Sequence, residues 1–424
     1  MIPSFIALLI LAQARAEWPT FRGPTGDGVA PAGVEPPLEW SESRNVAWKA
    51  AIPGRGRSSP VILGDRVFVT FARETNVQRR KIGPDEMQTA DHVSLGAAGV
   101  DRQTGRILWE RTLSEVDKPD PVHYLNSWAT PTPAVVPGRL FCDFGGWGTW
   151  CLDPESGKTL WEKKIPLDHQ VGPGSSLALH GKLVILVRDG RDAQYVLALD
   201  QETGEQTWKA DRPPVQANHP NAKKSFSTAL EIERGGKRQL IAVGPHWVAS
   251  YDPEDGRELW RLRHGDGYSI GSVPVYGGDL LYVGTGCSRP NMLAMKVDGS
   301  GEQPASGLAW RSAKSIPMMS SPLYYGGGVY WNSDDGTATC VDPATGAVRW
   351  QTRLGEGTLA SPLGAAGRVY FFGKEGKTTV VKPGESLEKL AENKLDGTVI
   401  ATPAAAGKSL FLRTDTHLYR LENR

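Results

Sequence analysis

The sequence predicts an all-β fold in which one small sheet is repeated around a ring. A nine-residue pattern, with Gly four residues after Asp and Trp four residues after Gly, occurs five times. The first four copies start about 50 residues apart, the spacing of a repeated supersecondary unit. No window shows the sustained 3.6-residue apolar periodicity of a helix. The copies are residues 101–109, 153–161, 200–208, 252–260 and 342–350.

Each copy predicts a tight turn followed by an outer strand. Asp and Thr or Ser can bond their own backbone in the turn, and Gly supplies a positive φ. A Trp at the end of each unit buries a large area, so it is expected to dock one sheet against the next. These structural docking residues are Trp48, Trp109, Trp161, Trp208, Trp260, Trp310 and Trp350.

A second recurring element, two apolar strands joined by a Gly turn after a small-residue start, occurs eight times. Its copies are residues 57–71, 129–144, 173–187, 226–243, 271–285, 320–333, 360–373 and 401–414. The last unit reaches Arg424 without an outer strand, whereas residues 45–52 form an unmatched outer strand. We therefore predict an eight-bladed β-propeller of four-stranded antiparallel blades, closed by N- and C-terminal strands that share one blade.

The N-terminus predicts export. The chain is apolar from Ile2 to Leu11 apart from two residues, and Ala14 and Ala16 form a small-x-small cleavage site. The start lacks Lys and Arg, which leaves an uncleaved anchor as the alternative, although the apolar run is too short to span a bilayer. We expect a signal peptide at 1–16, an extension at 17–39, one propeller domain at 40–424 and a periplasmic or extracellular location.

Charge excludes some partners. The 48 Lys and Arg residues balance 47 Asp and Glu residues, so no basic surface predicts binding to nucleic acid or to acidic lipid. We expect no nucleic acid and no membrane span. The expected partner is a protein, or a polar small molecule or glycan, of identity not given by the sequence.

The cysteines allow one bridge. Cys142 and Cys151 flank the loop Gly145–Gly148 of one hairpin, and directly opposed strand residues approach disulfide distance. We predict a disulfide there, with two buried thiols as the open alternative. No Cys and His spacing predicts a zinc site, so no metal is expected.

The repeated DxxTGxxxW element and the small-residue-Pro strand starts resemble the quinoprotein-type propellers over about residues 40–424. This group includes pyrroloquinoline quinone (PQQ) dehydrogenases and the propeller subunit of the outer-membrane β-barrel assembly machinery. The chain is most similar to secreted propeller proteins of planctomycete-type bacteria, usually labelled PQQ-binding-like. Residues 18–31, 123–133, 168–176 and 188–204 carry that similarity. The resemblance implies the fold and no particular activity.

Two departures argue against the dehydrogenase activity of that group. The resemblance implies a quinone held beside a disulfide of adjacent cysteines and a calcium ion held by Glu, Asn and Asp. This chain has no adjacent cysteines, and its Asp334-Asp335-Gly336 run is explained by a hairpin turn. We therefore predict a binding or scaffold module without a cofactor. PQQ with calcium in an oxidoreductase, or a polysaccharide-active enzyme with a carboxylate pair in the funnel, are the alternatives.

The two faces of the predicted ring differ. Short turns lie on one face, whereas insertions at 72–98 and 114–128 lie on the other, here named the inserted-loop face. Seven of the eight His residues fall at or beside that face, and binding sites are usually built from loops on a rigid scaffold. The predicted site consists of His123, Asn126, Trp128, His169, Asp189, Asp192 and His246. The alternative is that these residues only stabilise the blade ends.

Overall fold

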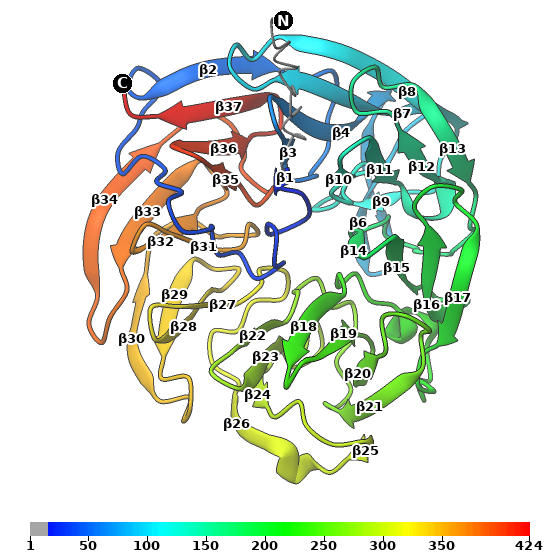
Figure 1. Cartoon of the computed structure of the whole chain (residues 1–424), viewed down its shortest axis with the longest axis vertical. Helices are drawn as coiled ribbons and strands as arrows, with labels where there is room; N and C mark the ends of the chain where they lie inside the picture. The colour runs from blue at the N-terminus through cyan, green and yellow to red at the C-terminus, as the bar shows by residue number, and fades with distance from the viewer. Residues whose placement is uncertain (1–15) are drawn as a thin grey trace, which may run out of the picture.

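The computed structural model describes residues 16–424, so the expected signal peptide lies outside the described residues except for Ala16. Antiparallel sheets surround a central axis, and the chain is an all-β propeller (Figure 1). The described part contains three short 3-10 helices, η1 (Gly145–Trp147), η2 (Pro220–Lys223) and η3 (Ala305–Gly307). No helix within residues 16–424 has the length and apolar character needed to cross a membrane.

Within residues 16–424, eight sheets each contain four antiparallel strands in a meander. The first four sheets contain β3 (Val61–Leu63), β4 (Arg66–Thr75), β7 (His92–Asp101) and β8 (Ile107–Asp117); β10 (Ala134–Val136), β11 (Arg139–Asp143), β12 (Thr149–Leu152) and β13 (Thr159–Lys163); β14 (Ala178–His180), β15 (Leu183–Asp189), β16 (Gln194–Asp200) and β17 (Gln206–Asp211); and β18 (Leu230–Arg234), β19 (Lys237–Val243), β20 (Trp247–Tyr251) and β21 (Glu258–Arg263).

The other four sheets follow in chain order around the ring. They contain β22 (Val275–Gly277), β23 (Leu280–Gly284), β24 (Met292–Met295) and β26 (Leu308–Ser312); β27 (Leu323–Tyr325), β28 (Gly328–Asn332), β29 (Thr337–Val341) and β30 (Val348–Arg353); β31 (Leu363–Ala365), β32 (Arg368–Phe372), β33 (Lys377–Lys382) and β34 (Glu388–Lys394); and β35 (Ala404–Ala406), β36 (Ser409–Arg413), β37 (His417–Glu422) and β2 (Val46–Ala51).

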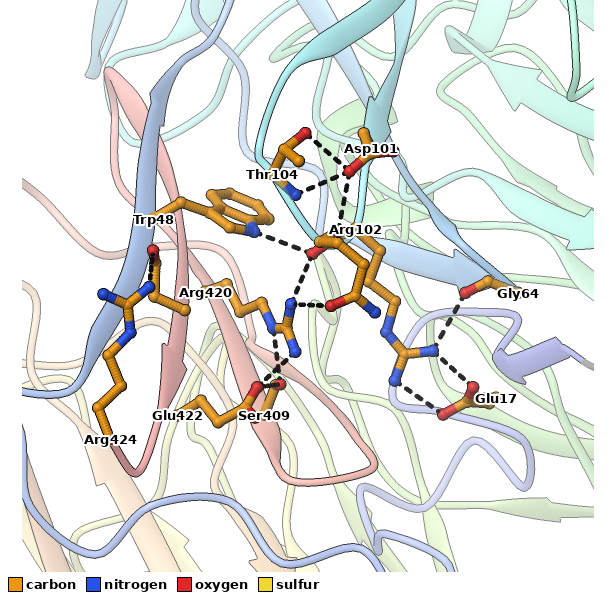
Figure 2. Close-up of polar contacts among 12 residues, drawn as sticks. Glu17, Trp48, Gly64, Asp101, Arg102, Thr104, Ser409, Arg420, Glu422 and Arg424 are labelled. Carbon is orange, nitrogen blue, oxygen red and sulfur yellow. Dashed lines mark hydrogen bonds and ion pairs between the residues drawn. The ribbon is translucent and has the colours of Figure 1, made fainter.

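The last sheet is completed by the N-terminal strand β2, which confirms the predicted closure. β2 pairs antiparallel with β37, from Val46 opposite Leu421 to Ala51 opposite His417. The Trp48 indole N–H also donates to the carbonyl oxygen of Arg102 in the first sheet (Figure 2). This pairing covers the edge of β37 that would otherwise be exposed.

In most of the sheets a tryptophan of the outer strand docks on the turn of the next sheet. In the turn, Asp153 Oδ1 accepts hydrogen bonds from the N–H and hydroxyl of Ser156, at 2.7 and 2.6 Å. Gly157 has φ +70°, and a Cβ there would lie 2.5 Å from the Trp109 ring, so the indole requires glycine. The same ring-on-glycine contact joins Trp48 to Gly105, Trp161 to Gly204, Trp208 to Gly256 and Trp310 to Gly346.

Trp260 is the exception among these residues. Its indole N–H donates to Gln239 Oε1 at 2.8 Å, within its own sheet, instead of to the next turn. The following unit is stretched in the sequence, and its extra strand β25 (Gly301–Gln303) pairs parallel with β21, with Gly301 opposite Trp260. The inserted strand therefore occupies the place where a docking turn would lie.

Hydroxyl groups at the starts of the innermost strands link neighbouring sheets. The N–H of Ser59 donates to Thr132 Oγ1 at 2.9 Å, and the N–H of Thr132 donates to Ser176 Oγ at 3.0 Å. The same bond joins Ser176 to Thr228, Val273 to Ser321, Ser321 to Ser361 and Ser361 to Thr402. These bonds explain the small polar residues that recur before each strand.

The insertions on the first sheet differ from the expectation. Residues 72–98 contain the ends of β4 and β7, which stay paired up to Thr75 opposite His92, because Val93 and Leu95 bury their side chains in the core. The hairpin of β5 (Gln78–Ile82) and β6 (Asp85–Thr89) projects beyond them. It joins β9 (Val122–His123) in a three-stranded sheet, so both inserted loops form one structure.

The predicted disulfide between Cys142 and Cys151 is wrong, since both are free thiols. Strands β11 and β12 pair with Cys142 opposite Trp150 and Cys151 opposite Phe141. Successive strand residues point to opposite faces, so this one-residue offset separates the two sulfur atoms across the sheet. Both cysteines are buried, each in a different apolar cluster between blades.

The extension at residues 17–39 crosses the centre of the ring, where Figure 1 shows it in dark blue. It begins with β1 (Ala16–Trp18), which pairs with β3 of the first sheet. The buried Arg22 donates to the carbonyl oxygens of Asp27 and Pro322, at 2.5 and 2.7 Å. Ala30 N–H donates to the Gly364 carbonyl oxygen at 2.8 Å, so the extension ties the first sheet to the sixth and seventh.

Candidate functional site

A cavity of about 360 Å³, the central pocket, lies on the axis of the ring. Every sheet contributes one lining residue from the same position of the repeat. This position lies three residues before the Pro that precedes the innermost strand, or before the residue that replaces this Pro. These residues are Arg57, Thr130, Gly174, Phe226, Gly271, Met319, Leu359 and Ile400. Loops of the inserted-loop face surround the mouth, and Phe21 of the extension closes the opposite end. The pocket is therefore blind.

One half of the central pocket is polar and carries two cations. Lys224 is only 4% exposed, and its ammonium group contacts Gln170 Oε1. Arg57 donates through Nη2 to the Tyr124 carbonyl oxygen at 2.9 Å, while its buried Nη1 has no partner among the described residues. Within residues 16–424, neither cation has a carboxylate within 4.0 Å. Buried charges are usually paired, so these two are unusual.

Burial shifts the pKa values of these groups. It lowers the pKa of Lys224 to about 8 and that of Arg57 to about 10. Burial also lowers the pKa of His123, and the charges of Arg57 and Lys224 lower it further against the opposing effect of Asp85. His123 is therefore a neutral hydrogen-bonding group near two cations at neutral pH.

The other half of the central pocket is apolar. Phe226 precedes the innermost strand of the fourth sheet, and Tyr268 lies in the loop between the fourth and fifth sheets. Met319, Leu359 and Ile400 precede the innermost strands of the sixth to eighth sheets. Ser361 and Thr402 beside them have their hydroxyl oxygens occupied as acceptors of the bonds that link the sheets. A ligand in the pocket would therefore contact charged groups on one side and hydrocarbon on the other.

A second cavity of about 360 Å³ lies beside the central pocket. Its lining includes Trp147, Asp168, His169 and Asp192. Burial, followed by the charge of Arg188, lowers the pKa of His169 to about 4, and neither ring nitrogen has a partner among the described residues. Asp168 pairs with Arg191 at 2.5 Å, so it is not available as a free carboxylate beside Asp192.

The structure distributes the seven predicted site residues over three places. His123 and Asn126 line the central pocket, whereas His169 and Asp192 line the second cavity. Trp128, Asp189 and His246 lie in neither cavity.

These three residues have structural roles: Trp128 and Asp189 bind other groups of the protein, and His246 lies in a tight turn. The indole N–H of Trp128 donates to the Asp120 carbonyl oxygen at 3.0 Å. Asp189 pairs with the buried Arg212 at 3.2 Å, and burial raises its pKa to about 6. His246 is 4% exposed and has φ +66°, at the turn before β20.

Sequence reasoning missed the residues that give the central pocket its character, namely Arg57, Lys224, Phe226 and Phe21. The sequence did contain a pattern that marks most of the residues lining the pocket. When the eight units are aligned on their strand starts, the position that holds Arg57 and Phe226 varies strongly, although the residues after it keep a small or hydroxyl character. Phe21 had no such signal, because it lies outside the repeat.

The described residues include no group of three His, Cys, Asp or Glu side chains placed to hold a metal ion. The acidic and amide groups of the central pocket are Asp85, Asn126 and Asn221. Asn126 donates to the carbonyl oxygens of Val171 and Pro173, and its Oδ1 accepts from Ser127 N–H. This residue set does not fit the calcium and quinone arrangement that the resemblance implies.

A closed propeller with a blind axial pocket is the class of protein that these features define. The family model described as outer membrane protein assembly factor BamB matches residues 94–243, 244–337 and 302–382. The chain belongs to this family.

Two relatives illustrate its range. BamB of Alteromonas naphthalenivorans is 26% identical over 59% of this chain and 60% of its own length. Quinohemoprotein alcohol dehydrogenase ADH-IIG of Pseudomonas putida is 27% identical over 46% of this chain and 26% of its own length. The chain thus spans less than two thirds of either relative.

Solved structures show the same fold. BamB from Moraxella catarrhalis has a TM-score of 0.58 at 12% identity, with 84% of this chain and 96% of that chain covered. Quinohemoprotein alcohol dehydrogenase ADHIIG from Pseudomonas putida HK5 has a TM-score of 0.62 at 11% identity, with 96% and 80% covered. At these identities the similarity concerns the fold alone.

Proposed function

We propose that this protein is a periplasmic or extracellular binding module whose ligand site is the central pocket. The observation that carries the proposal is a blind axial pocket in which Lys224 and Arg57 are buried without a carboxylate partner. A fold does not retain buried, unpaired charges for stability, because each costs desolvation free energy. A bound ligand would supply the missing partner.

The family membership supports the location and the binding role. The BamB relatives are named as outer membrane protein assembly factors, which agrees with a protein that is exported and acts by binding. Their partners are not transferred to this chain, because the matched segment covers 60% of the first relative. We propose the pocket, and not a catalytic centre, as the working part of the inserted-loop face.

A catalytic role with PQQ and calcium has weaker support. Quinohemoprotein alcohol dehydrogenase ADH-IIG is similar to this chain in both sequence and fold, so the fold accommodates that chemistry elsewhere. In this chain the pocket offers Asp85 with two Asn residues, of which Asn126 is engaged with backbone groups. The proposed function therefore includes no redox step.

A paired substitution tests the site. Met319 lines the central pocket and Met318, its neighbour, is 39% exposed and does not line it. Met319→Trp should fill the pocket, whereas Met318→Trp should leave it open. Thermal-shift screening of a panel of small carboxylates, phosphates, sugars and amines should give ligands that bind wild type and Met318→Trp but not Met319→Trp. Ligands that stabilise all three proteins equally would contradict the pocket as the site.

A further inference from the structure

The central pocket is divided between charge and hydrocarbon. Arg57, which precedes the first sheet, and Lys224, which precedes the fourth, line the pocket with His123, and both charges lower the pKa of this histidine. Met319, Leu359 and Ile400 precede the innermost strands of the sixth, seventh and eighth sheets. The sheets follow one another in chain order around the ring (Figure 1), so the segments that lead into the first and fourth sheets carry the cations and those that lead into the sixth to eighth carry the apolar residues.

The carboxylates near the cations do not neutralise them by contact. Asp85 accepts a hydrogen bond from Gln170 Nε2 at 3.3 Å, and the oxygen of the same Gln170 side chain faces Lys224. Gln170 thus separates the acid from the amine. Glu74 acts on Arg57 by its charge, but no ion pair within 4.0 Å joins the two groups among the described residues. The positive side of the pocket therefore retains the capacity to bind an anion.

The size and lining restrict the rest of the ligand. A volume of about 360 Å³ admits a small molecule and not a folded segment of protein. The wall formed by Met319, Leu359 and Ile400 is hydrocarbon, and contact with it removes apolar ligand surface from water, which favours binding. A ligand that is charged all round would leave this wall unmatched.

We propose that the central pocket binds a small amphipathic anion, with its carboxylate or phosphate head on Arg57 and Lys224 and its apolar body against Met319, Leu359 and Ile400. This inference rests on the proposed function of the pocket. Arg can hold two oxygens of such a head through its planar fork, and Lys supplies a point charge. The amide of Asn221, which also lines the pocket, adds a further donor.

Four probes of equal chain length test the charge preference. Octanoate, octyl phosphate, octylamine and octanol share one apolar tail and differ in the head group. Isothermal titration calorimetry of the wild type should give binding of one or both anions, at least about tenfold tighter than octanol, and no measurable binding of octylamine. The ratio between octanoate and octyl phosphate identifies the preferred head. Equal affinity for octanol and the anions, or tighter binding of octylamine, would overturn the proposal.

Neighbouring residues of the same type supply matched controls. Lys224→Gln and Arg57→Gln should each weaken binding of the preferred anion by about 10- to 150-fold, the range for hydrogen bonds to charged groups. Lys223→Gln and Arg55→Gln, at positions that do not line the pocket, should leave the affinity unchanged. Lys224→Arg, which keeps the charge, should retain most of the affinity. Unchanged binding in both folded Gln variants would overturn the proposal.

The pH dependence gives an independent readout. The charged groups that act on Lys224 are Asp85, Asp168 and Arg191, and Cys287 stays neutral because burial raises the pKa of its thiol. Since the pKa of Lys224 is about 8, the affinity for octanoate should fall as pH rises through that value. Lys224→Arg should remove this fall. A flat wild-type profile between pH 7 and pH 9 would contradict the assigned role of Lys224.

The Met319→Trp variant distinguishes a failure of the anion inference from a failure of the proposed ligand site. If Met319→Trp abolishes binding of every probe but the head group has no effect in wild type, the pocket remains the site and only the anion inference fails. If Met319→Trp binds the anions as wild type does, the pocket is not the site and the proposed function fails with the inference.

Discussion

The indole N–H of Trp48 donates a hydrogen bond to the carbonyl oxygen of Arg102 at 2.9 Å (Figure 2). Trp48 belongs to β2 in the last sheet, and Arg102 lies in the turn between β7 and β8 of the first. The ring also covers Gly105, where a Cβ would lie 2.7 Å from the indole. Arg420 of β37 donates to the same carbonyl oxygen at 3.1 Å. This carbonyl therefore joins both chain ends to the first sheet.

Loss of this junction should destabilise the entire ring. We predict that Trp48→Ala lowers the free energy of unfolding by about 3–5 kcal/mol, because a buried aromatic side chain and its hydrogen bond are removed. Urea denaturation should remain a single cooperative transition, and Trp147→Ala, at a partly exposed ring outside the docking positions, should cost less. Faster hydrogen exchange confined to β2 and β37, with unchanged global stability, would contradict this role.

The glycines under the docking indoles provide a second test. Gly157 and Gly138 both have positive φ, +70° and +80°, but only Gly157 faces a ring, whereas nothing lies within 4 Å of a Cβ at Gly138. Gly138→Ala should cost only the strain of the left-handed backbone, about 1–2 kcal/mol. Gly157→Ala should cost about 1–3 kcal/mol more, because the methyl group displaces Trp109. Equal midpoints in thermal unfolding would show that the indole has no part in the glycine requirement.

The extension should be necessary for a blind pocket. Arg22 is wholly buried and holds the backbone carbonyls of Asp27 and Pro322. Arg22→Ala should lower the free energy of unfolding by about 2–4 kcal/mol, since both acceptors lose a charged donor. Limited proteolysis should then cut within residues 17–39, and Arg44→Ala, at an exposed ion pair, should not change the digest. An uncut extension in Arg22→Ala would argue against this anchor.

Acid sensitivity should arise from a buried histidine. Burial lowers the pKa of His264 to about 4, whereas an unfolded His titrates near about 6.5. Between these values the unfolded state binds more protons, so stability falls as pH decreases from about 6.5 to about 4, by on the order of 3 kcal/mol. His264→Gln should remove roughly half of this slope, because burial also lowers the pKa of His169 to about 4 and that histidine contributes in the same direction. An unchanged slope, with His219→Gln as the exposed control, would exclude His264 as its source.

Addition of PQQ and calcium should produce no dye-linked oxidation of alcohols or sugars. The reason is the residue set of the central pocket, in which Asp85 is accompanied by Asn126 and Asn221 and no adjacent cysteines exist in the chain. Absorbance of the quinone and reduction of the dye are the two readouts. Saturable, quinone-dependent dye reduction would favour the oxidoreductase alternative over the binding module.

Local patterns in the sequence were sufficient for most of the fold. The Asp-Gly-Trp spacing encodes contacts within one turn and between adjacent units, so Trp109 and Gly157 could be interpreted without distant information. The register of paired strands was harder to predict from the sequence. The hairpin pairs Cys142 with Trp150 and Cys151 with Phe141, so the two cysteines are not directly opposite each other. Their side chains therefore point to opposite faces of the sheet.

The site was harder to predict, because it depends on contacts between distant segments. Arg22 donates a hydrogen bond to the carbonyl oxygen of Pro322, which lies 300 residues away in the sequence, and no periodic pattern in residues 17–39 predicts this contact. The sidedness of the histidines selected His123, which lines the central pocket, but it also selected His246, which lies in neither cavity. Variation at the repeat position of Arg57 and Ile400 is the stronger indicator, since it marks the position that faces the axis.

A crystal structure of the protein with saturating octanoate tests the central claim most directly. The account predicts density in the central pocket, with the carboxylate within hydrogen-bond distance of Arg57 or Lys224 and the chain against Leu359 and Ile400. Ligand density confined to another surface, with the central pocket filled by water, would contradict the account.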